Sequence, residues 1–341
     1  MKIINQELFS VVAVTFLVPG PTALAQGLPL QAIHVVSISG RNLPVVIGQR
    51  QGMFVKHGLD VQLEVAPNSD ALRSALASDK SDIAHAAVDN AVAMVESAAA
   101  DVVIVMGGEG SLNELIAQPG IHSISELRGK TLIVDAPNTA FALQLKKILL
   151  SSGLQAGRDY QLKAIGATPV RLQAMREHQD YAASMLGPPS SIEAKRDGFV
   201  SLGSTQKFIG AYQGFGAFVR REWAREHSDA LIRYIAAYVE AVRWLLDPAN
   251  KQQVAELLMQ ESGLPASLAT ESYEVSTTSQ GGYQPDACLD VDGFRNVLKL
   301  RAEVEGQWGG RTPAADKYYD RSYYEQAVAG LSAAKRNITP K

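Results

Sequence analysis

The chain has 341 residues, of which 46% are apolar and 20% are charged, a composition typical of a globular protein rather than a disordered or membrane-embedded one. A formal net charge of −3 gives no electrostatic signature of nucleic-acid binding. The only cysteine, Cys288, excludes an intrachain disulfide. Its neighbours Asp286 and Asp290 argue against a reactive thiolate, so we expect a small apolar side chain there.

The first 25 residues have the pattern of a secretory signal peptide. A short apolar run over residues 9–18 is followed by Pro-Gly-Pro, and Ala23-Leu24-Ala25 supplies a small-residue cleavage site. The run is too short to span a bilayer as a helix, so we expect neither a permanent anchor nor any other insertion into the membrane. We therefore predict cleavage after Ala25, with 1–25 as the signal peptide, and a location outside the cytoplasm, which the family resemblance described below narrows to the periplasm.

Beyond residue 25 the chain is longer than the size at which a single hydrophobic core stops growing, which predicts two lobes. Strand-like and helix-like patterns alternate through the first of them. In chain order we expect a strand at 33–38, a helix at 43–57, a strand at 61–65, a short helix opened by Ser69 and Asp70, a strand at 82–88, a helix opened by Asp89 and Asn90, and a strand at 102–106. The last is a continuous apolar run, which is typical of a buried parallel strand.

The same alternation of strand-like and helix-like patterns begins again near residue 125. We expect a strand at 131–134, a helix opened by Asn138 and Thr139, a strand at 160–165, a helix at 169–178, a strand at 181–186, and a further helix after Gly187-Pro188-Pro189. From about Ala211 the pattern is helical, with an apolar stripe from Leu231 to Leu246. Alternation of strands and helices at this spacing predicts an α/β fold built on parallel sheets.

Three segments carry a family pattern: LPVVIGQRQGMFVKHGLDV at 43–61, ALASDKSDIA at 75–84, and LRGKTLIV at 127–134. Their order and content resemble the type 2 periplasmic substrate-binding proteins of ABC importers, in the SsuA/NMT1/THI5-like branch. Members of this branch bind ligands of the sulfonate, nitrate and taurine type. None of the three segments is specific for one ligand.

The resemblance implies a two-lobed type 2 periplasmic-binding-protein fold with a cleft between the lobes. Lobe 1 should comprise 26–114 and 213–341, and lobe 2 should comprise 115–212. Two crossover strands, near 114–117 and 208–212, should join them, and the C-terminal helices should return to lobe 1. A small-molecule ligand should bind in the cleft, and closure should present it to the permease subunits of an ABC importer. The family expectation is a monomer.

Open parallel sheets bind ligands beyond the carboxyl ends of their strands, so the residues that follow each strand are candidate ligand-binding residues. In the first lobe these are Ser39, Arg41, Asn42, Asn68, Ser69, Asp89, Asn90, Gly108 and Glu109. A carboxylate in the cleft, at Asp89 or Glu109, favours a ligand with an amine or a ring N–H donor. Helix capping or a solvated turn explains several of the other residues equally well.

Four further candidates lie in the second lobe and on its return: Asn138, Thr139, Pro188 and Tyr212. The backbone N–H groups of the helix opened by Asn138 and Thr139 suit a carboxylate, sulfonate or phosphate oxygen, although capping alone also explains both residues. Tyr212 either stacks on a flat ligand or only packs the hinge. Together these residues favour an anionic or heterocyclic ligand.

We expect no cofactor and no metal, since the sequence has no cluster of histidines and cysteines at metal-binding spacing. His34 and His85 lie inside expected strands, where a lone histidine is more often an interior group than a metal ligand. Two other functions stay open. One is a lyase or hydrolase of a small aromatic or heterocyclic acid on the same fold, using Asp89 or Glu109 with His85 as acid and base. The other is a solute sensor that docks on a membrane receptor.

Overall fold

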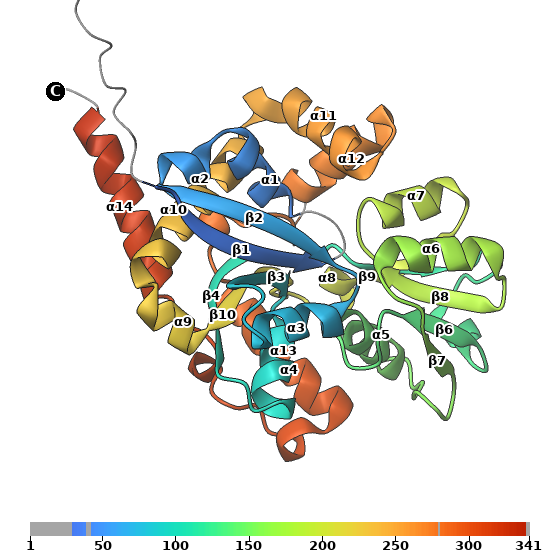
Figure 1. Cartoon of the computed structure of the whole chain (residues 1–341). Helices are drawn as coiled ribbons and strands as arrows, with labels where there is room; N and C mark the ends of the chain where they lie inside the picture. Colours follow the sequence, from blue (N-terminus) through green and yellow to red (C-terminus); the bar gives the residue numbers. More distant parts are fainter. Residues whose placement is uncertain (1–28, 39–41, 279, 339–341) are drawn as a thin grey trace, which may run out of the picture.

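A computed structural model describes residues 29–38, 42–278 and 280–338 of the chain. The expected signal peptide, and with it the cleavage site after Ala25, lies outside the described residues, as do Ser39 and Arg41. The described residues form two lobes, each built on its own five-stranded sheet (Figure 1). Within this part of the chain, no helix combines the length and apolarity needed to cross a membrane.

The first sheet has the strand order β2-β1-β3-β10-β4. Its strands are β1 (Gln31–Ile38), β2 (Leu59–Ala66), β3 (Ile83–Ala87), β4 (Val102–Glu109) and β10 (Phe215–Arg220). β1 is parallel to β2 and to β3, whereas β10 is antiparallel to both of its neighbours. The return strand β10 thus lies between β3 and β4 and separates two strands that run in the same direction.

The expectation of a parallel partner for the run 102–106 is therefore wrong. β4 is buried as expected, but it pairs with β10 in antiparallel register at the edge of the sheet. Its burial has a different cause: Val103 and Val105 face one hydrophobic core, while Val102 and Ile104 face the other. A continuous apolar run indicates that both faces of a strand are buried. It does not specify which strand pairs with it, or in which direction.

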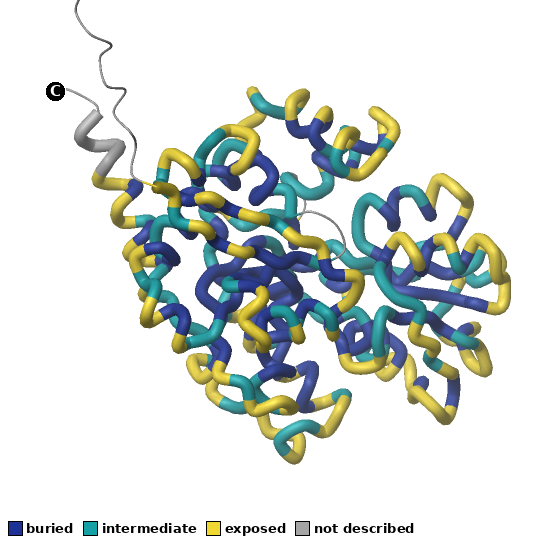
Figure 2. The backbone as a smooth tube through the Cα atoms, in the orientation of Figure 1, coloured by how far each residue is buried: buried dark blue, intermediate teal, exposed yellow. Residues whose placement is uncertain are grey.

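Helices cover both faces of the first sheet. On one face the core includes residues of α2 (Met53–Lys56), α9 (Arg221–Glu226), α10 (Ser228–Leu246) and α14 (Ser322–Ile338). On the other face it includes residues of α3 (Ser69–Ala77), α4 (Asp89–Ser97) and α13 (Val291–Glu305). Figure 2 shows the middle of this lobe as mostly buried, whereas the edge strand β2 also carries exposed residues.

The helix expected at 43–57 is two helices, α1 (Leu43–Arg50) and α2. Gly52 lies between them with φ 66°, in the left-handed region that ends a right-handed helix. The apolar spacing runs on across this break, which is why periodicity alone predicts one helix.

The second sheet has the order β7-β6-β8-β5-β9. Its strands are β5 (Glu114–Ala117), β6 (Thr131–Val134), β7 (Gln161–Ala164), β8 (Tyr181–Leu186) and β9 (Val200–Ser204). α5 (Ala140–Leu150) contributes to the core on one face, whereas α6 (Thr168–Glu177) and α7 (Ser190–Arg196) contribute to the core on the other. The carboxyl ends of β6 and β8 lead towards the first lobe (Figure 1).

Two helices and several short turns complete the chain. α11 (Lys251–Ser262) and α12 (Ala266–Thr278) pack on each other, and α12 also contacts α7 of the second lobe. α8 (Thr205–Phe208) follows β9. Short 3₁₀ helices are η1 (Ile124–Leu127), η2 (Pro248–Asn250), η3 (Pro285–Ala287), η4 (Gln307–Gly310) and η5 (Ala315–Lys317).

The chain crosses between the lobes twice, at 110–113 and at 205–214, which we call the first and second crossings. The segment 114–117, expected as a crossover strand, is β5 and belongs to the second sheet, while 208–212 is not a strand. The two crossings touch at glycines. A Cβ on Gly214 would lie 1.8 Å from the backbone oxygen of Gly110, so only glycine permits this approach. The Gly214 N–H donates to the Glu109 carbonyl oxygen at 3.1 Å.

Candidate functional site

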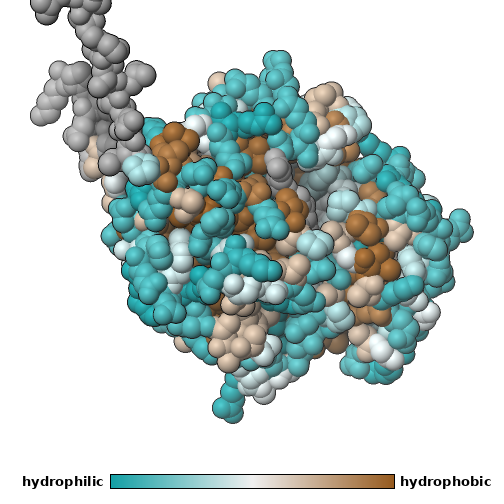
Figure 3. Space-filling view, viewed as in Figure 1, coloured by the Kyte–Doolittle hydropathy of each residue, from teal (hydrophilic) through white to brown (hydrophobic). Residues whose placement is uncertain are grey.

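A cavity of about 250 Å³ lies between the two lobes. The first sheet lines it through the ends of β1, β3 and β4, and the second lobe lines it through the first turns of α5, α6 and α7. The first crossing forms its floor, and residues of α10 and α12 close it from the C-terminal part of the chain. In Figure 3 apolar patches lie on both lobes beside the hollow between them. The volume is close to the lower end of ligand pockets, about 300 Å³, and suits a compact solute.

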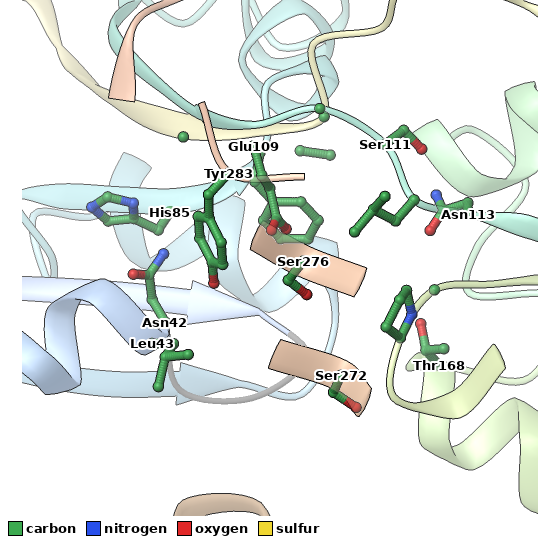
Figure 4. Close-up of a pocket in the computed structure, with 18 of the residues that line it drawn as sticks. Asn42, Leu43, His85, Glu109, Ser111, Asn113, Thr168, Ser272, Ser276 and Tyr283 are labelled. Carbon is green, nitrogen blue, oxygen red and sulfur yellow. The ribbon is translucent and has the colours of Figure 1, made fainter. Parts of the chain in front are cut away.

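Glu109, the last residue of β4, directs its carboxylate into the middle of this cavity (Figure 4). Among the described residues that line the cavity there is no lysine or arginine. Burial raises the pKa of Glu109 from 4.5 to about 7, because a carboxylate away from water and away from a cation is destabilised relative to the neutral acid.

Gln213 fixes the backbone at Glu109. Its side-chain Nε2 donates to the carbonyl oxygens of Glu109, at 3.1 Å, and Phe215, at 2.7 Å. Its Oε1 accepts from the backbone N–H of Asp290 at 2.8 Å. Because Gln213 is fully buried and uses both ends of its amide, it ties β4, β10 and α13 together beneath the carboxylate.

Aromatic side chains surround the carboxylate. Tyr283, in the turn after α12, lies beside Glu109 in Figure 4, and its backbone bridges to Glu109 in antiparallel fashion. Six aromatic residues line the cavity: Phe141, Tyr212, Phe215, Tyr238, Tyr273 and Tyr283. Burial, and to a smaller degree the nearby Glu109 charge, raises the pKa of Tyr283 and of Tyr238, so both phenols remain neutral.

His85, from β3, is a neutral group in the wall of the cavity. Its Nε2 is 2.8 Å from the hydroxyl oxygen of Tyr234, and its ring stacks on Tyr238 with centroids 4.9 Å apart. Burial lowers the pKa of His85 to about 3. His34 lies on β1 with its side chain half exposed, next to Asp82. It is a surface residue, in contrast to the interior position expected for it.

The second-lobe side of the cavity is a neutral polar network. The Asn113 Nδ2 donates to Gln144 Oε1 at 2.9 Å, and the Thr205 hydroxyl donates to the same oxygen at 3.0 Å. Ser111 joins them through Thr205 at 3.3 Å. These side chains come from both crossings and from α5, so the network joins the two lobes at the cavity floor.

Four of the other sequence-predicted residues also line the cavity: Asn42, Gly108, Pro188 and Tyr212. Asn42 caps α1 through its Oδ1, which accepts from the Val45 N–H at 3.2 Å, and it is seen at the cavity edge in Figure 4. With Glu109, the structure thus brings five of the predicted residues to one cavity.

Asp89 and Asn138 are elsewhere, and the expectation that the Asp89 carboxylate faces the cleft is wrong. Arg301 of α13 forms a bidentate ion pair with Asp89, with Nη2 2.8 Å from Oδ2, and both side chains are almost fully buried. The same guanidinium donates to Asn138 Oδ1 at 3.2 Å. Asp89 does not cap α4 either, because it is the first helical residue and Val88 occupies the cap position.

The remaining predicted residues surround a second, very small hollow of about 10 Å³, room for about one water molecule. They are Asn68, Ser69, Asn90 and Thr139. Asn68, not Ser69, caps α3, and the Thr139 hydroxyl donates to Asp135 Oδ1 at 2.6 Å. Ala140 and Phe141, the first residues of α5, do reach the main cavity.

Several lining residues gave no signal in the sequence. Tyr238 lies in the middle of an amphipathic helix, and Tyr283 and Ser272 come from the last quarter of the chain, where no strand end marks them. Ser272 is also unusual because its hydroxyl is buried at the cavity wall and has no hydrogen-bond partner among the described residues. Three or more potential metal ligands do not come together anywhere in the described part of the chain.

The chain is similar to known proteins in both sequence and fold. The model of the NMT1/THI5-like family matches residues 41–251. A protein of Brucella abortus (strain 2308), named as a binding protein, is 27% identical over 231 residues, which cover 67% of this chain and 70% of the relative. The nitrate-binding protein NrtA of Synechocystis PCC 6803 superimposes with a TM-score of 0.73 at 12% identity, covering 92% of each chain.

The alkanesulfonate-binding protein SsuA of Xanthomonas axonopodis pv. citri, bound to MOPS, superimposes with a TM-score of 0.68 at 16% identity, covering 84% of this chain and 96% of that one. The two-lobed α/β fold and the family expected from the sequence are thereby confirmed. At these identities the two structures inform on the fold alone.

Proposed function

Because the chain belongs to the NMT1/THI5-like family, we propose that it is the periplasmic solute-binding protein of an ABC importer. It captures a small organic molecule in the cavity between its lobes and releases it unchanged to the permease. Export with removal of residues 1–25, and action as a monomer, are parts of this proposal. They rest on the signal-peptide pattern and on the family.

The cavity between two lobes joined by two crossings is the observation that supports this proposal most. The two crossings, 110–113 and 205–214, are the links about which the lobes, 26–114 with 213–341 and 115–212, can rotate. Such a rotation has to break the polar contacts between α5 and α13, Lys146–Glu305 and Lys147–Glu303. α12 touches α7 across the cavity mouth, where Arg196 Nη2 is 2.6 Å from Glu271 Oε2. This contact joins the two lobes beside the cavity, since α7 and α12 both also contribute residues to its lining.

An enzyme on this fold is the second candidate, and Glu109 is the observation that favours it. A carboxyl group with a pKa of about 7 has the acidity expected of a general acid or base at neutral pH. Its expected partners are missing, however. Asp89 is held by Arg301 away from the cavity, and His85 stays neutral above pH about 3. Reversible binding needs no such partner.

A thermal-shift screen of the purified protein tests the proposal. The panel holds organic cations, neutral heterocycles, amino acids, aliphatic and aromatic carboxylates, sulfonates and nitrate. A ligand at a hundred times its Kd should stabilise the fold by about 2.7 kcal/mol. Each hit is recovered after overnight incubation and identified by mass spectrometry. Recovery of the intact compound supports a binding protein, whereas conversion supports the enzyme.

A pair of matched variants shows whether a hit occupies the cavity. Ser276→Phe fills the space next to Glu109 and should abolish the shift. Ser97→Phe makes the same chemical change at an exposed position at the end of α4 and should leave the shift intact. A hit that survives Ser276→Phe binds outside the cavity and contradicts the proposed site.

A further inference from the structure

We propose that the solute bound in this cavity is a compact organic cation, whose positively charged nitrogen pairs with the Glu109 carboxylate among the surrounding aromatic rings. This inference deepens the proposed function and rests on it. It assigns to the cavity a ligand of opposite charge to nitrate and to alkanesulfonates, the anions named for two proteins of the same fold.

The charge of the described lining supports a cation. Glu109 is the only charged side chain among the described residues that face the cavity, and every other polar lining group is a neutral serine, threonine, asparagine, glutamine, tyrosine or histidine. An anion placed there would meet a carboxylate with no lysine or arginine among these residues to offset the repulsion. A cation would supply the missing partner.

The surroundings of Glu109 in the ligand-free protein also favour a cationic ligand. The structure gives its carboxylate no ion pair and no hydrogen bond within the described residues, and burial is the single cause of its raised pKa. An unpaired buried charge is destabilising, so this site is incomplete until a proton or a cationic group arrives. Asp89, the first residue of α4 just after β3, shows the alternative, since a protein arginine pairs with its carboxylate.

Aromatic faces favour a cation over a neutral molecule of the same shape. The quadrupole of a ring attracts a positive nitrogen within about 6 Å of its centre, with about 0.5–2 kcal/mol for each good contact. Tyr283 lies beside Glu109, and Tyr238, Phe215 and Phe141 complete the walls. The Ser272 hydroxyl, which has no hydrogen-bond partner among the described residues, adds one neutral polar group for the ligand.

Size limits the cation to a small one. A cavity of about 250 Å³ accepts a quaternary ammonium alcohol, a protonated amine or an amidinium on a single ring, and excludes peptides and oligosaccharides. Recognition by one carboxylate and aromatic walls needs no particular number of N–H donors, so quaternary ammonium groups belong to the class.

Cation binding should displace a proton from Glu109. The other titratable groups that face it do not change charge near neutral pH: His85 of β3 is neutral above about pH 3, and Tyr212, Tyr238 and Tyr283 have pKa values raised by burial. Asp286, further along the Tyr283 loop, is paired with Arg243 at 2.6 Å. Affinity for a cation should therefore rise with pH and level off above about pH 7.

Two sets of shape-matched probes test the inference by isothermal titration calorimetry of the purified protein. The first is benzamidine, benzamide and benzoate, which carry charges of +1, 0 and −1 on nearly the same frame. The second is choline and its neutral isostere 3,3-dimethyl-1-butanol. We expect at least one cation to bind at least tenfold more tightly than its matched neutral or anionic counterpart.

The variant Glu109→Gln keeps the shape of the side chain and removes its charge. For a cation with N–H groups it should weaken binding by about 10- to 150-fold, the range for hydrogen bonds to a charged group. For any cation of the probe set it should lower the affinity and abolish the pH dependence. Glu64→Gln, a matched change at an exposed position on β2, should alter neither. Tyr283→Phe should retain most of the affinity, because the ring face remains.

The outcomes separate this inference from the proposed function. If a carboxylate, sulfonate or nitrate from the wider screen binds in the cavity and the cations do not, the inference is wrong and the binding protein stands. If the cations bind equally well to Glu109→Gln, the inference is also wrong. If neither the cations nor any member of the wider screen binds, both the inference and the proposed function are contradicted.

Discussion

Asp89 and Glu109 are two acidic residues at the same edge of one sheet, and the structure uses them in opposite ways. Asp89 follows β3 and Glu109 ends β4. Asp89 is buried against Arg301, which satisfies both carboxylate oxygens. Glu109 lies partly buried in the cavity wall, with no counter-ion among the described residues. One carboxylate therefore stabilises the folded protein, and the other is left for a ligand.

The comparison shows that position at a strand end does not decide the role of a charged residue. The deciding factor is whether the fold places a residue of opposite charge next to the carboxylate. For Asp89 that residue is Arg301, 212 positions along the chain. A buried pair is costly to break from one side, whereas a buried unpaired group lowers stability until it is protonated or bound. The following predictions test that distinction.

Breaking the Asp89 pair should have the largest effect. Arg301→Met removes the guanidinium and leaves the Asp89 carboxylate buried and unpaired, so the free energy of unfolding should fall by about 3–5 kcal/mol. Urea denaturation followed by circular dichroism measures this loss. The double variant Asp89→Asn with Arg301→Met should recover part of it. A loss below about 1 kcal/mol for Arg301→Met would contradict a structural role for the pair.

Glu109 should change stability with pH in the opposite sense to a paired acid. Its pKa is raised from 4.5 to about 7 in the folded state, so its contribution is fully present below pH 4.5 and is lost as the pH rises towards 7. The loss amounts to about 3 kcal/mol at 1.36 kcal/mol for each pH unit. His85 acts in reverse, because its pKa is lowered to about 3 and its contribution is lost as the pH falls below 6.5.

The contributions of Glu109 and His85 to the pH dependence of stability partly cancel in the wild-type protein. The effect of Glu109 is therefore measured as a difference between two proteins. The free energy of unfolding is compared between wild type and Glu109→Gln from pH 4.5 to pH 7.5, without ligand. The variant should become the more stable of the two as the pH rises. A difference that stays constant across this range would show that Glu109 is paired or solvated in the free protein. Glu64→Gln serves as the exposed control.

A substitution at the crossing should disturb Glu109 without touching the Asp89 pair. The Cβ of Gly214→Ala would lie 1.8 Å from the Gly110 oxygen, so the two crossings must separate. We expect a loss of about 1–3 kcal/mol in stability, the usual cost of overpacking, together with weaker ligand binding. Gly120→Ala, where a Cβ meets no atom within 4 Å, should change neither by a measurable amount.

The exposed contact at the cavity mouth should have the smallest effect. Arg196 and Glu271 are both about half exposed, and such ion pairs contribute about 0–1 kcal/mol. Because this pair joins α7 to α12 across the mouth, Arg196→Ala should weaken ligand binding by no more than about fivefold and leave the unfolding midpoint unchanged. Arg295→Ala removes an exposed pair within α13 and should leave affinity unaltered. Equal effects of the two variants would contradict a role of Arg196 in closure.

Most strands and helices were predictable because the local pattern of apolar and polar residues indicates them. The strands at 131–134 and 181–186 have the bounds expected from their apolar runs. The exceptions depend on non-local structure. β10 is a short strand after Ala211, and it forms because the returning chain inserts between β3 and β4. Gly52 interrupts an apolar stripe that otherwise continues through both α1 and α2.

The candidate site was predictable only where it consists of strand ends. This rule explains why Asn42, Gly108 and Glu109 line the cavity. Two other predicted residues also line it: Pro188, which follows β8, and Tyr212, in the second crossing. The same rule also selected Asp89, whose arginine partner has no local signal. Helices and turns from the C-terminal part of the chain supply Tyr238, Ser272 and Tyr283. None of these residues follows a strand, so the strand-end rule does not find them.

The most direct test of the account is the number of protons released when the tightest cation of the probe set binds. Calorimetry at pH 6.5 in two buffers with different ionisation enthalpies measures that number. A carboxyl group with a pKa of about 7 is about three-quarters protonated at this pH, so wild type should release ~0.75 proton and Glu109→Gln none. Binding of the cation without proton release, or with equal release from both proteins, would contradict the assignment of Glu109 as the ligand's partner.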